Sequence, residues 1–171
     1  MGFNFEFRQI EDYRDVSRII DFISSKPLNY PNYNMWVEKT EQELLQGQKQ
    51  SIIALFDNHL AGDVIYQPHK QIPGFLEIKN VRVSEEVRRR DFGHFMLKQI
   101  EVEARNSGNY SALIVDARVS QRDIINLLTF SGFSPVTSIS LYDSNEEDII
   151  MIKSLTKENS GLIQLTKSFF D

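Results

Sequence analysis

Residues 75–93 have the sequence FLEIKNVRV, SEEV and RRRDFG, and this stretch is the most informative about the fold. Its first nine residues, Phe75–Val83, predict a strand, and an amphipathic helix is expected from Phe92 onward. A strand that enters a helix through a short loop directs backbone N–H groups and the positive end of a helix dipole at one point, which suits an anion such as a pyrophosphate. Arg88–Arg90 add positive charge there, although charge alone fits a solvated surface loop equally well.

The elements on both sides of this stretch predict an α/β fold with a mixed sheet. Their order is β-α-α-β-β-β-α-β-α-β-β, which indicates antiparallel pairing early in the chain and a parallel crossover in the middle. One helix is expected over Phe92–Asn106 and another shortly before Gly132. The expected strands are Phe3–Arg8, Ser51–Phe56, Ala61–Tyr66, Phe75–Val83, Tyr110–Ala117, Val136–Tyr142 and Asp148–Leu155.

Two further helices are expected near the start of the chain. Asp12 can cap the first, which presents an apolar face at helical spacing and ends at Pro27. A loop rich in proline, asparagine and aromatic residues is expected from Pro27 to Trp36. The sequence Thr40–Glu43 has the pattern of a capping box and predicts the start of a short second helix that ends near Gly47.

The chain is expected to divide into a domain over residues 1–155 and a C-terminal extension over residues 156–171. In the extension, Leu162, Leu165 and Phe169 form an apolar stripe at helical spacing. The extension is therefore expected to form a helix that packs on the domain or lies at a dimer contact.

The composition excludes several kinds of site. With 171 residues, 41% hydrophobic and 25% charged, the chain has the composition of one globular protein. It has no cysteine, which excludes disulfides and a cysteine nucleophile and favours a cytoplasmic location. Its three histidines are scattered, so we expect no metal site. The net charge of −5 argues against nucleic-acid binding. No apolar run approaches the roughly 20 residues that a membrane span needs.

Residues 88–93, RRRDFG, resemble the signature of the GNAT superfamily of acetyl-coenzyme A-dependent N-acetyltransferases. That signature is Arg or Gln, two residues, Gly or Ala, one residue, Gly or Ala, and then an apolar helix. The order of the elements over Phe3–Leu155 is also similar to the family's. The resemblance implies a GNAT-like three-layer sandwich, with a mixed central sheet of about seven strands and about four helices.

The resemblance also implies where acetyl-coenzyme A binds. The pantetheine would lie along the strand edge Asn80–Val83 and the pyrophosphate at Arg88–Gly93. The residues expected to contact the coenzyme are Val81, Arg82, Val83, Arg88, Arg89, Arg90, Asp91, Phe92, Gly93 and His94.

Two residues depart from the family's pattern. Asp91 replaces the first small residue of the signature, and its carboxylate could cap the helix and repel the phosphates, or turn away and leave the backbone amide usable. Leu128 stands where many members have a tyrosine that protonates the departing thiolate. Tyr142 is a possible replacement, and a half-buried strand aromatic is the alternative interpretation.

The resemblance implies that Glu77 is the general base. It lies between Leu76 and Ile78 on the strand before the phosphate loop, and partial removal from water would make its carboxylate a better proton acceptor near neutral pH. The alternative is a structural ion pair with Lys79, which shares its face of the strand.

Three aromatic residues, Tyr30, Tyr33 and Trp36, lie where the family's first two helices form one wall of the acceptor site. Such rings can hold the stem or the cation of an amine. The alternative is that Trp36 packs over the edge of the core.

These observations predict an N-acetyltransferase that moves an acetyl group from acetyl-coenzyme A to a primary amine, which is either a small molecule or a protein lysine or N-terminus. The amine would attack the thioester directly, with Glu77 as general base and without a metal. The alternative from another class is a non-catalytic module that senses acyl-coenzyme A or binds a protein. A subunit of a homodimer is also possible.

Overall fold

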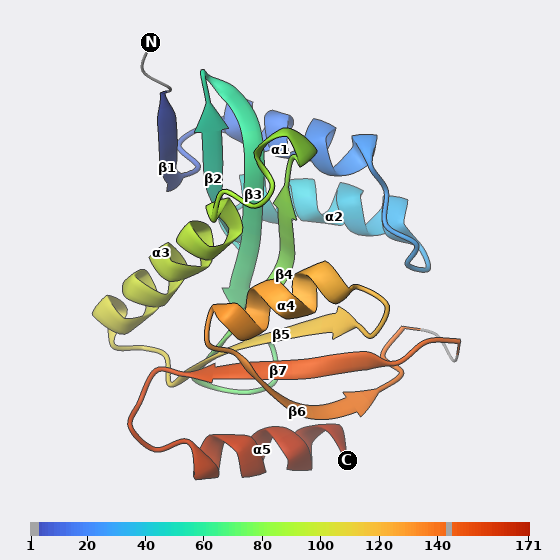
Figure 1. Cartoon of the computed structure of the whole chain (residues 1–171), viewed down its shortest axis with the longest axis vertical. Helices are drawn as coiled ribbons and strands as arrows, with labels where there is room; N and C mark the ends of the chain where they lie inside the picture. Colours follow the sequence, from blue (N-terminus) through green and yellow to red (C-terminus); the bar gives the residue numbers. More distant parts are fainter. Residues whose placement is uncertain (1–3, 143–144) are drawn as a thin grey trace. The chain divides into compact units, whose positions relative to one another are not determined.

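The computed structural model describes residues 4–142 and 145–171 (Figure 1). The predicted α/β class with a mixed seven-stranded sheet is confirmed, and the strand order is β1-β2-β3-β4-β5-β7-β6. Phe3, expected to start the first strand, lies outside the described residues. The strands are β1 Phe5–Gln9, β2 Gln50–Phe56, β3 His59–Pro68, β4 Phe75–Val83, β5 Ala112–Arg118, β6 Ser134–Ile139 and β7 Asp148–Ser154. The helices are α1 Tyr13–Ser25, α2 Tyr33–Leu45, the 3-10 turn η1 Glu85–Val87, α3 Phe92–Ser107, α4 Arg122–Phe130 and α5 Ser160–Phe170.

The chain forms two compact units, each built from two stretches of sequence. Unit 1 contains the chain up to Gln67 together with Asn80–Met96, and unit 2 contains Pro68–Lys79 together with Leu97–Asp171. Strand β4 therefore contributes its first residues to unit 2 and its last residues to unit 1. No helix within the described residues is long and apolar enough to cross a membrane.

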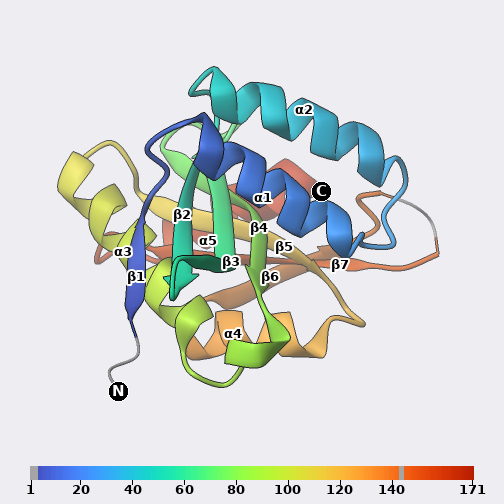
Figure 2. The ribbon, with the colours of Figure 1, turned by 90° about the horizontal axis from the view of Figure 1, so that it is seen from above.

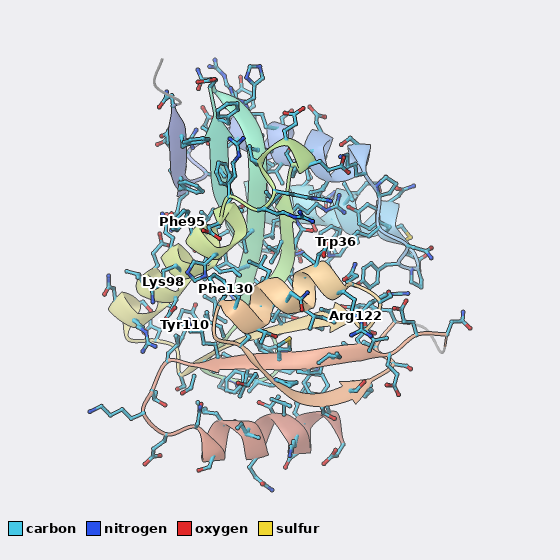
Figure 3. All side chains as sticks on the ribbon, viewed as in Figure 1. Trp36, Phe95, Lys98, Tyr110, Arg122 and Phe130 are labelled. Atoms are coloured by element: carbon cyan, nitrogen blue, oxygen red, sulfur yellow. The ribbon has the colours of Figure 1, made fainter. Side chains whose placement is uncertain are left out.

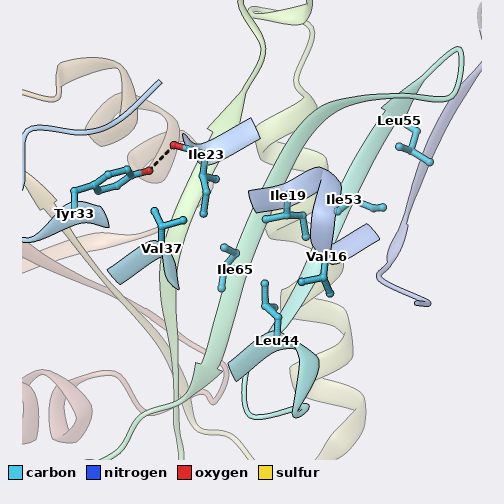
Figure 4. Close-up of a cluster of buried hydrophobic side chains, with 9 residues drawn as sticks. All are labelled: Val16, Ile19, Ile23, Tyr33, Val37, Leu44, Ile53, Leu55 and Ile65. Atoms are coloured by element: carbon cyan, nitrogen blue, oxygen red, sulfur yellow. Dashed lines mark hydrogen bonds between the residues drawn. The ribbon is translucent and has the colours of Figure 1, made fainter. Parts of the chain in front are cut away.

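Unit 1 has its core where α1 and α2 pack on β2 and β3 (Figure 4). Asp12 caps α1 as predicted, because its carboxylate accepts hydrogen bonds from the backbone N–H groups of Arg14 and Asp15. The buried side chains of this core are Val16, Ile19, Ile23, Tyr33, Val37, Leu44, Ile53, Leu55 and Ile65.

The second helix begins earlier than its capping pattern predicted. It starts at Tyr33, so the last part of the expected loop is helical and Thr40 lies in the middle of the helix. Thr40 and Glu43, the two ends of the apparent capping box, instead bind the buried ammonium of Lys49 at 3.1 and 2.7 Å. Burial of Tyr33, Val37 and Leu44 in the core of unit 1 outweighed the local capping pattern.

A polar clamp fixes the end of α1 and the start of α2 to β4 within unit 1. The Arg82 guanidinium donates to the carbonyl oxygens of Ile23 and Lys26, and to the hydroxyl of Tyr33 at 2.7 Å. The Tyr33 hydroxyl in turn donates to the carbonyl of Ile23 at 2.8 Å (Figure 4). The carbonyls at a helix C-terminus have no partner inside the helix and carry the negative end of its dipole, so a cation is well placed there.

Unit 2 contains the other half of the sheet. Strands β4 and β5 pair in parallel from Phe75 opposite Ala112 to Ile78 opposite Val115, while β5–β7 and β6–β7 are antiparallel. Helices α4 and α5 lie on opposite sides of these strands (Figure 2). Leu162, Ile163 and Phe170 of α5 pack against a buried cluster that includes Phe75 and Ile114. The C-terminal helix thus packs on the core of unit 2.

Strand β6 ends earlier than expected. It stops at Ile139, after a register irregularity near Pro135, and the backbone N–H of Leu141 donates to the Asp148 carboxylate at 3.2 Å. Tyr142 consequently lies beyond the strand on which it was predicted.

Loss of the clamp should destabilise the protein. We expect Arg82→Met to lower the free energy of unfolding by about 2 kcal/mol or more, because two carbonyl oxygens at the end of α1 and the buried Tyr33 hydroxyl lose a charged donor. Arg90→Met, at an exposed position in the same unit, should change it by less than about 0.5 kcal/mol. Urea unfolding of both variants provides the measurement, and equal stabilities would show that the clamp contributes nothing.

Candidate functional site

The predicted anion site lies in unit 1, where β4 leads through η1 into α3. Two residues of the connecting loop, Arg89 and Asp91, have left-handed backbone conformations, with φ of 62° and 61°. The side chains of Arg88, Arg89 and Arg90 are exposed. These conformations turn the chain sharply, so that α3 begins immediately after the basic residues.

Asp91 stands at a position whose backbone favours glycine. A φ of 61° is adopted readily by glycine, and aspartate is among the few other residues that tolerate this conformation. The Asp91 carbonyl accepts the hydrogen bond from the N–H of Phe95 at 2.9 Å, so Asp91 occupies the cap position of α3. Its carboxylate is exposed beside the helix N-terminus.

The first turn of α3 is held in place by aromatic packing. The ring of Phe92 is buried and contacts the rings of Phe5 and Phe7 on β1, with centroid distances of 5.2 and 5.1 Å. Gly93 is also buried, His94 is half-buried, and Phe95 is 51% exposed (Figure 3). The first N–H groups of a helix have no partner within it, so this fixed first turn presents donors that an anion could use.

The last residues of β4 also belong to unit 1. Val81 and Val83 are half-buried. The Asn80 amide donates to the Asp63 carboxylate at 2.6 Å, and the other Asp63 oxygen is buried without a partner among the described residues. Complete burial raises the pKa of Asp63 to about 7, although the Asn80 hydrogen bond and the charge of Arg82 oppose the rise.

A pocket of about 210 Å³ lies wholly within unit 2. Its polar lining brings together two residues that the sequence singled out, Glu77 and Tyr142, with three that it did not, His69, Gln71 and Asp116. Its apolar lining is Ile114, Val115, Leu141, Ile150, Phe169 and Phe170. The structure thus places Glu77, the expected base, in the same pocket as a second carboxylate, that of Asp116.

The two carboxylates have different partners. Glu77 accepts from the Lys79 ammonium at 3.0 Å, and both side chains keep about a fifth of their surface exposed. Asp116 accepts from the Tyr142 hydroxyl at 2.9 Å. Burial raises the pKa of Asp116, while Lys79 and Tyr142 lower it by smaller amounts.

The remaining predicted residues have structural neighbours inside their own units. Tyr33 is buried and joins the clamp, and Trp36 packs on the core of unit 1, with the Lys49 ammonium 5.5 Å from the centre of its ring. Tyr30 is half-buried. A role for these three rings in holding an acceptor stays a prediction. Leu128 is completely buried in α4 and offers no proton donor.

The sequence contains a signal that marks Asp116 as a candidate site residue, but it contains none for His69. A carboxylate that interrupts the apolar run of a buried strand is unusual and has to be paired or to serve a site. Within residues 4–142 and 145–171, no three His, Asp or Glu side chains are grouped so that they could hold a metal ion.

Comparison with protein families gives one match, to the model described as "Acetyltransferase (GNAT) family", over residues 16–133 and hence over more than half of the chain. None of the curated proteins that were compared matches the sequence.

Many solved structures share the fold. A GNAT-family acetyltransferase structure from Desulfovibrio desulfuricans has a TM-score of 0.78 and 16% identity, over 90% of this chain and 100% of its own. The ribosomal-protein-S18-alanine N-acetyltransferase from Escherichia coli has a TM-score of 0.72 and 19% identity, over 92% and 97%. An acetyltransferase from Salmonella typhimurium, solved with its cofactor acetyl-CoA, has a TM-score of 0.71 and 14% identity, over 92% and 97%. At these identities the likeness shows the fold.

The buried Asp63 carboxyl should make stability depend on pH. Its pKa is about 7 in the folded chain and ordinarily 3.8, so between these values the folded chain binds the proton more tightly and the free energy of unfolding falls as pH rises. Asp63→Asn removes this pH dependence. The free energy of unfolding of the variant minus that of the natural chain should therefore rise between pH 4 and pH 8, by an amount on the order of a few kcal/mol.

Urea unfolding at both pH values measures this difference. Asp21→Asn, at an exposed position on α1, is the matched control and should show no such gain. A difference between Asp63→Asn and the natural chain that stays constant with pH would contradict the prediction.

Proposed function

The chain belongs to the GNAT family of acetyltransferases, and from this premise we propose that it moves an acetyl group from acetyl-coenzyme A to a primary amine. The observation that carries the proposal is strand β4. Its unit 2 half bears Glu77 in a pocket, and its unit 1 half leads directly into the basic loop and the N-terminus of α3.

The residues of unit 1 fit the coenzyme. N–H groups in the first turn of α3 would bind the pyrophosphate, and the exposed Arg88–Arg90 would balance its charge. The backbone of Asn80–Val83 would bind the pantetheine and polarise the thioester carbonyl. The coenzyme itself supplies the activated acetyl group.

The residues of the unit 2 pocket supply the proton transfers. Glu77 would accept the proton of the attacking amine as the C–N bond forms and the C–S bond breaks. Tyr142, which lines the same pocket, would give a proton to the departing thiolate, since Leu128 cannot. The acceptor is a small molecule or a protein lysine or N-terminus.

One alternative function has specific support. The Glu77–Lys79 ion pair, the exposed carboxylate of Asp91 and the apolar Leu128 would all fit a non-catalytic member that senses acyl-coenzyme A or binds a protein. Release of free thiol from acetyl-coenzyme A across a panel of amines and peptides separates the two. Coenzyme binding without thiol release for every acceptor would favour the alternative, and absence of coenzyme binding would exclude both coenzyme-dependent functions.

Removal of the Asp91 carboxylate should tighten coenzyme binding. We expect Asp91→Gly to lower the Kd for acetyl-coenzyme A by about fivefold, which corresponds to roughly 1 kcal/mol for a charge at a helix end. Asp91→Asn tolerates the same backbone conformation but lacks the charge, so it separates electrostatics from backbone strain. Calorimetric titration measures each Kd, and weaker binding in both variants would show that the carboxylate belongs to the site.

Loss of the proposed base should reduce turnover without affecting the coenzyme. Glu77→Gln should lower kcat by about 10²-fold or more and leave the Kd of acetyl-coenzyme A nearly unchanged. Lys79→Met is the control, because it breaks the same ion pair and keeps the carboxylate. If Glu77 is only structural, both variants would lose similar stability, about 1 kcal/mol or less, and both would keep normal turnover.

A further inference from the structure

The unit 2 pocket has one polar end and one aromatic wall. Glu77 on β4 and Asp116 on β5 lie on the same face of the parallel pair, because Glu77 is opposite Ile114 and Asp116 follows two residues later. Phe169 and Phe170 of α5 provide the aromatic wall, and the His69 ring meets Phe169 edge-on at a centroid distance of 5.6 Å.

The charges at the polar end leave one negative group in excess. Glu77 is balanced by Lys79 in an ion pair. Burial lowers the pKa of His69, which keeps the ring neutral at neutral pH. Asp116 accepts from the neutral hydroxyl of Tyr142, and its carboxylate has further acceptor positions. The side chains that line the pocket, together with the Lys79 ammonium that is paired with Glu77, therefore carry one net negative charge. This favours a ligand with a single positive charge.

The desolvation of Asp116 points to the same kind of ligand. Burial disfavours its charged form, and the excess negative charge next to apolar side chains is stabilised when a cation enters. An ammonium beside an aromatic ring also gains cation–π stabilisation. A carboxylate or phosphate in this place would meet two like charges.

The volume of the pocket and its aromatic wall limit what the part of the ligand beyond the ammonium group can be. A volume of about 210 Å³ corresponds to roughly seven water molecules at their volume in the liquid and lies below the range of about 300–1,000 Å³ usual for drug-sized ligands. Phe169 is 39% exposed, so apolar surface is available for contact. The one excess negative charge can balance a single ammonium, so a second ammonium would enter the pocket as an unbalanced charge, which disfavours diamines.

We propose that this pocket binds a small primary monoamine with an apolar stem, whose ammonium group is held by Asp116 and whose stem lies against Phe169. Acetylation of that amine rests on the proposed function, but its binding does not. Asp116 is thus a substrate-binding residue that selects the acceptor, distinct from Glu77, which takes the proton.

The probes are 2-phenylethylamine, its neutral analogue 2-phenylethanol, and butane-1,4-diamine. Calorimetric titration at pH 7.5, with and without saturating coenzyme A, should give a Kd for 2-phenylethylamine at least tenfold lower than for either of the others. Asp116→Asn and Phe169→Ala should each raise that Kd about tenfold, as expected for a lost charge-assisted hydrogen bond or a lost aromatic contact.

Two variants on α4 are matched controls. Asp123→Asn removes an exposed carboxylate, and Phe130→Ala removes a ring that is 68% exposed (Figure 3). Both should bind 2-phenylethylamine as the natural chain does, and thermal melting of all four variants establishes that they are folded. No binding of the amine under either condition, tighter binding of the alcohol or the diamine, or Asp116→Asn and Phe169→Ala values within twofold of their controls would overturn the proposal.

The outcomes also separate this proposal from the proposed function. Selective amine binding that depends on Asp116 and Phe169, without thiol release from acetyl-coenzyme A, would support the amine site and contradict the transferase. Acetylation of 2-phenylethylamine with a KM unaffected by either substitution would support the transferase and overturn the assigned site.

Discussion

A single guanidinium group, that of Arg82, fastens the end of α1 and the start of α2 to strand β4. It donates hydrogen bonds to two carbonyl oxygens at the end of α1 that have no partner within the helix. It also orders the Tyr33 hydroxyl, which donates to the Ile23 carbonyl at the same end. Arg82 lies in the four residues of β4 proposed to bind the pantetheine. The clamp therefore fixes that segment through the Arg82 side chain and uses none of the segment's own backbone N–H and C=O groups. A similar constraint acts at Asn80, whose amide is bound to the buried Asp63.

Backbone conformation, more than charge, explains the entry to α3. The left-handed residues Arg89 and Asp91 turn the chain sharply enough for the helix to begin at Phe92, and the Phe92 ring then fixes the helix through its contacts on β1. Aspartate meets the conformational demand of this position at the cost of a carboxylate near the proposed pyrophosphate. The departure from the family signature is thus conservative for the fold and unfavourable for an anion.

In unit 2 the two carboxylates of the pocket have different neighbours. Glu77 is ion-paired with Lys79, whereas Asp116 accepts from the Tyr142 hydroxyl and has its pKa raised by burial. Helix α5 completes the arrangement, because its aromatic end closes a pocket whose floor is the sheet.

The sequence was enough to predict the α/β class, the order of the elements, the cap at Asp12 and the junction at residues 75–93, because these depend on periodicity and on contacts between near neighbours in the chain. It misplaced the start of α2 and the end of β6, where burial of Tyr33 and hydrogen bonding to Asp148 overrode local patterns. It singled out Glu77 and Tyr142 but not their association with His69, Asp116 and Phe169. That pocket and the Arg82 clamp exist only in the folded chain, because their members come from distant parts of the sequence. No local pattern records which side chains the sheet and the packed helices bring together.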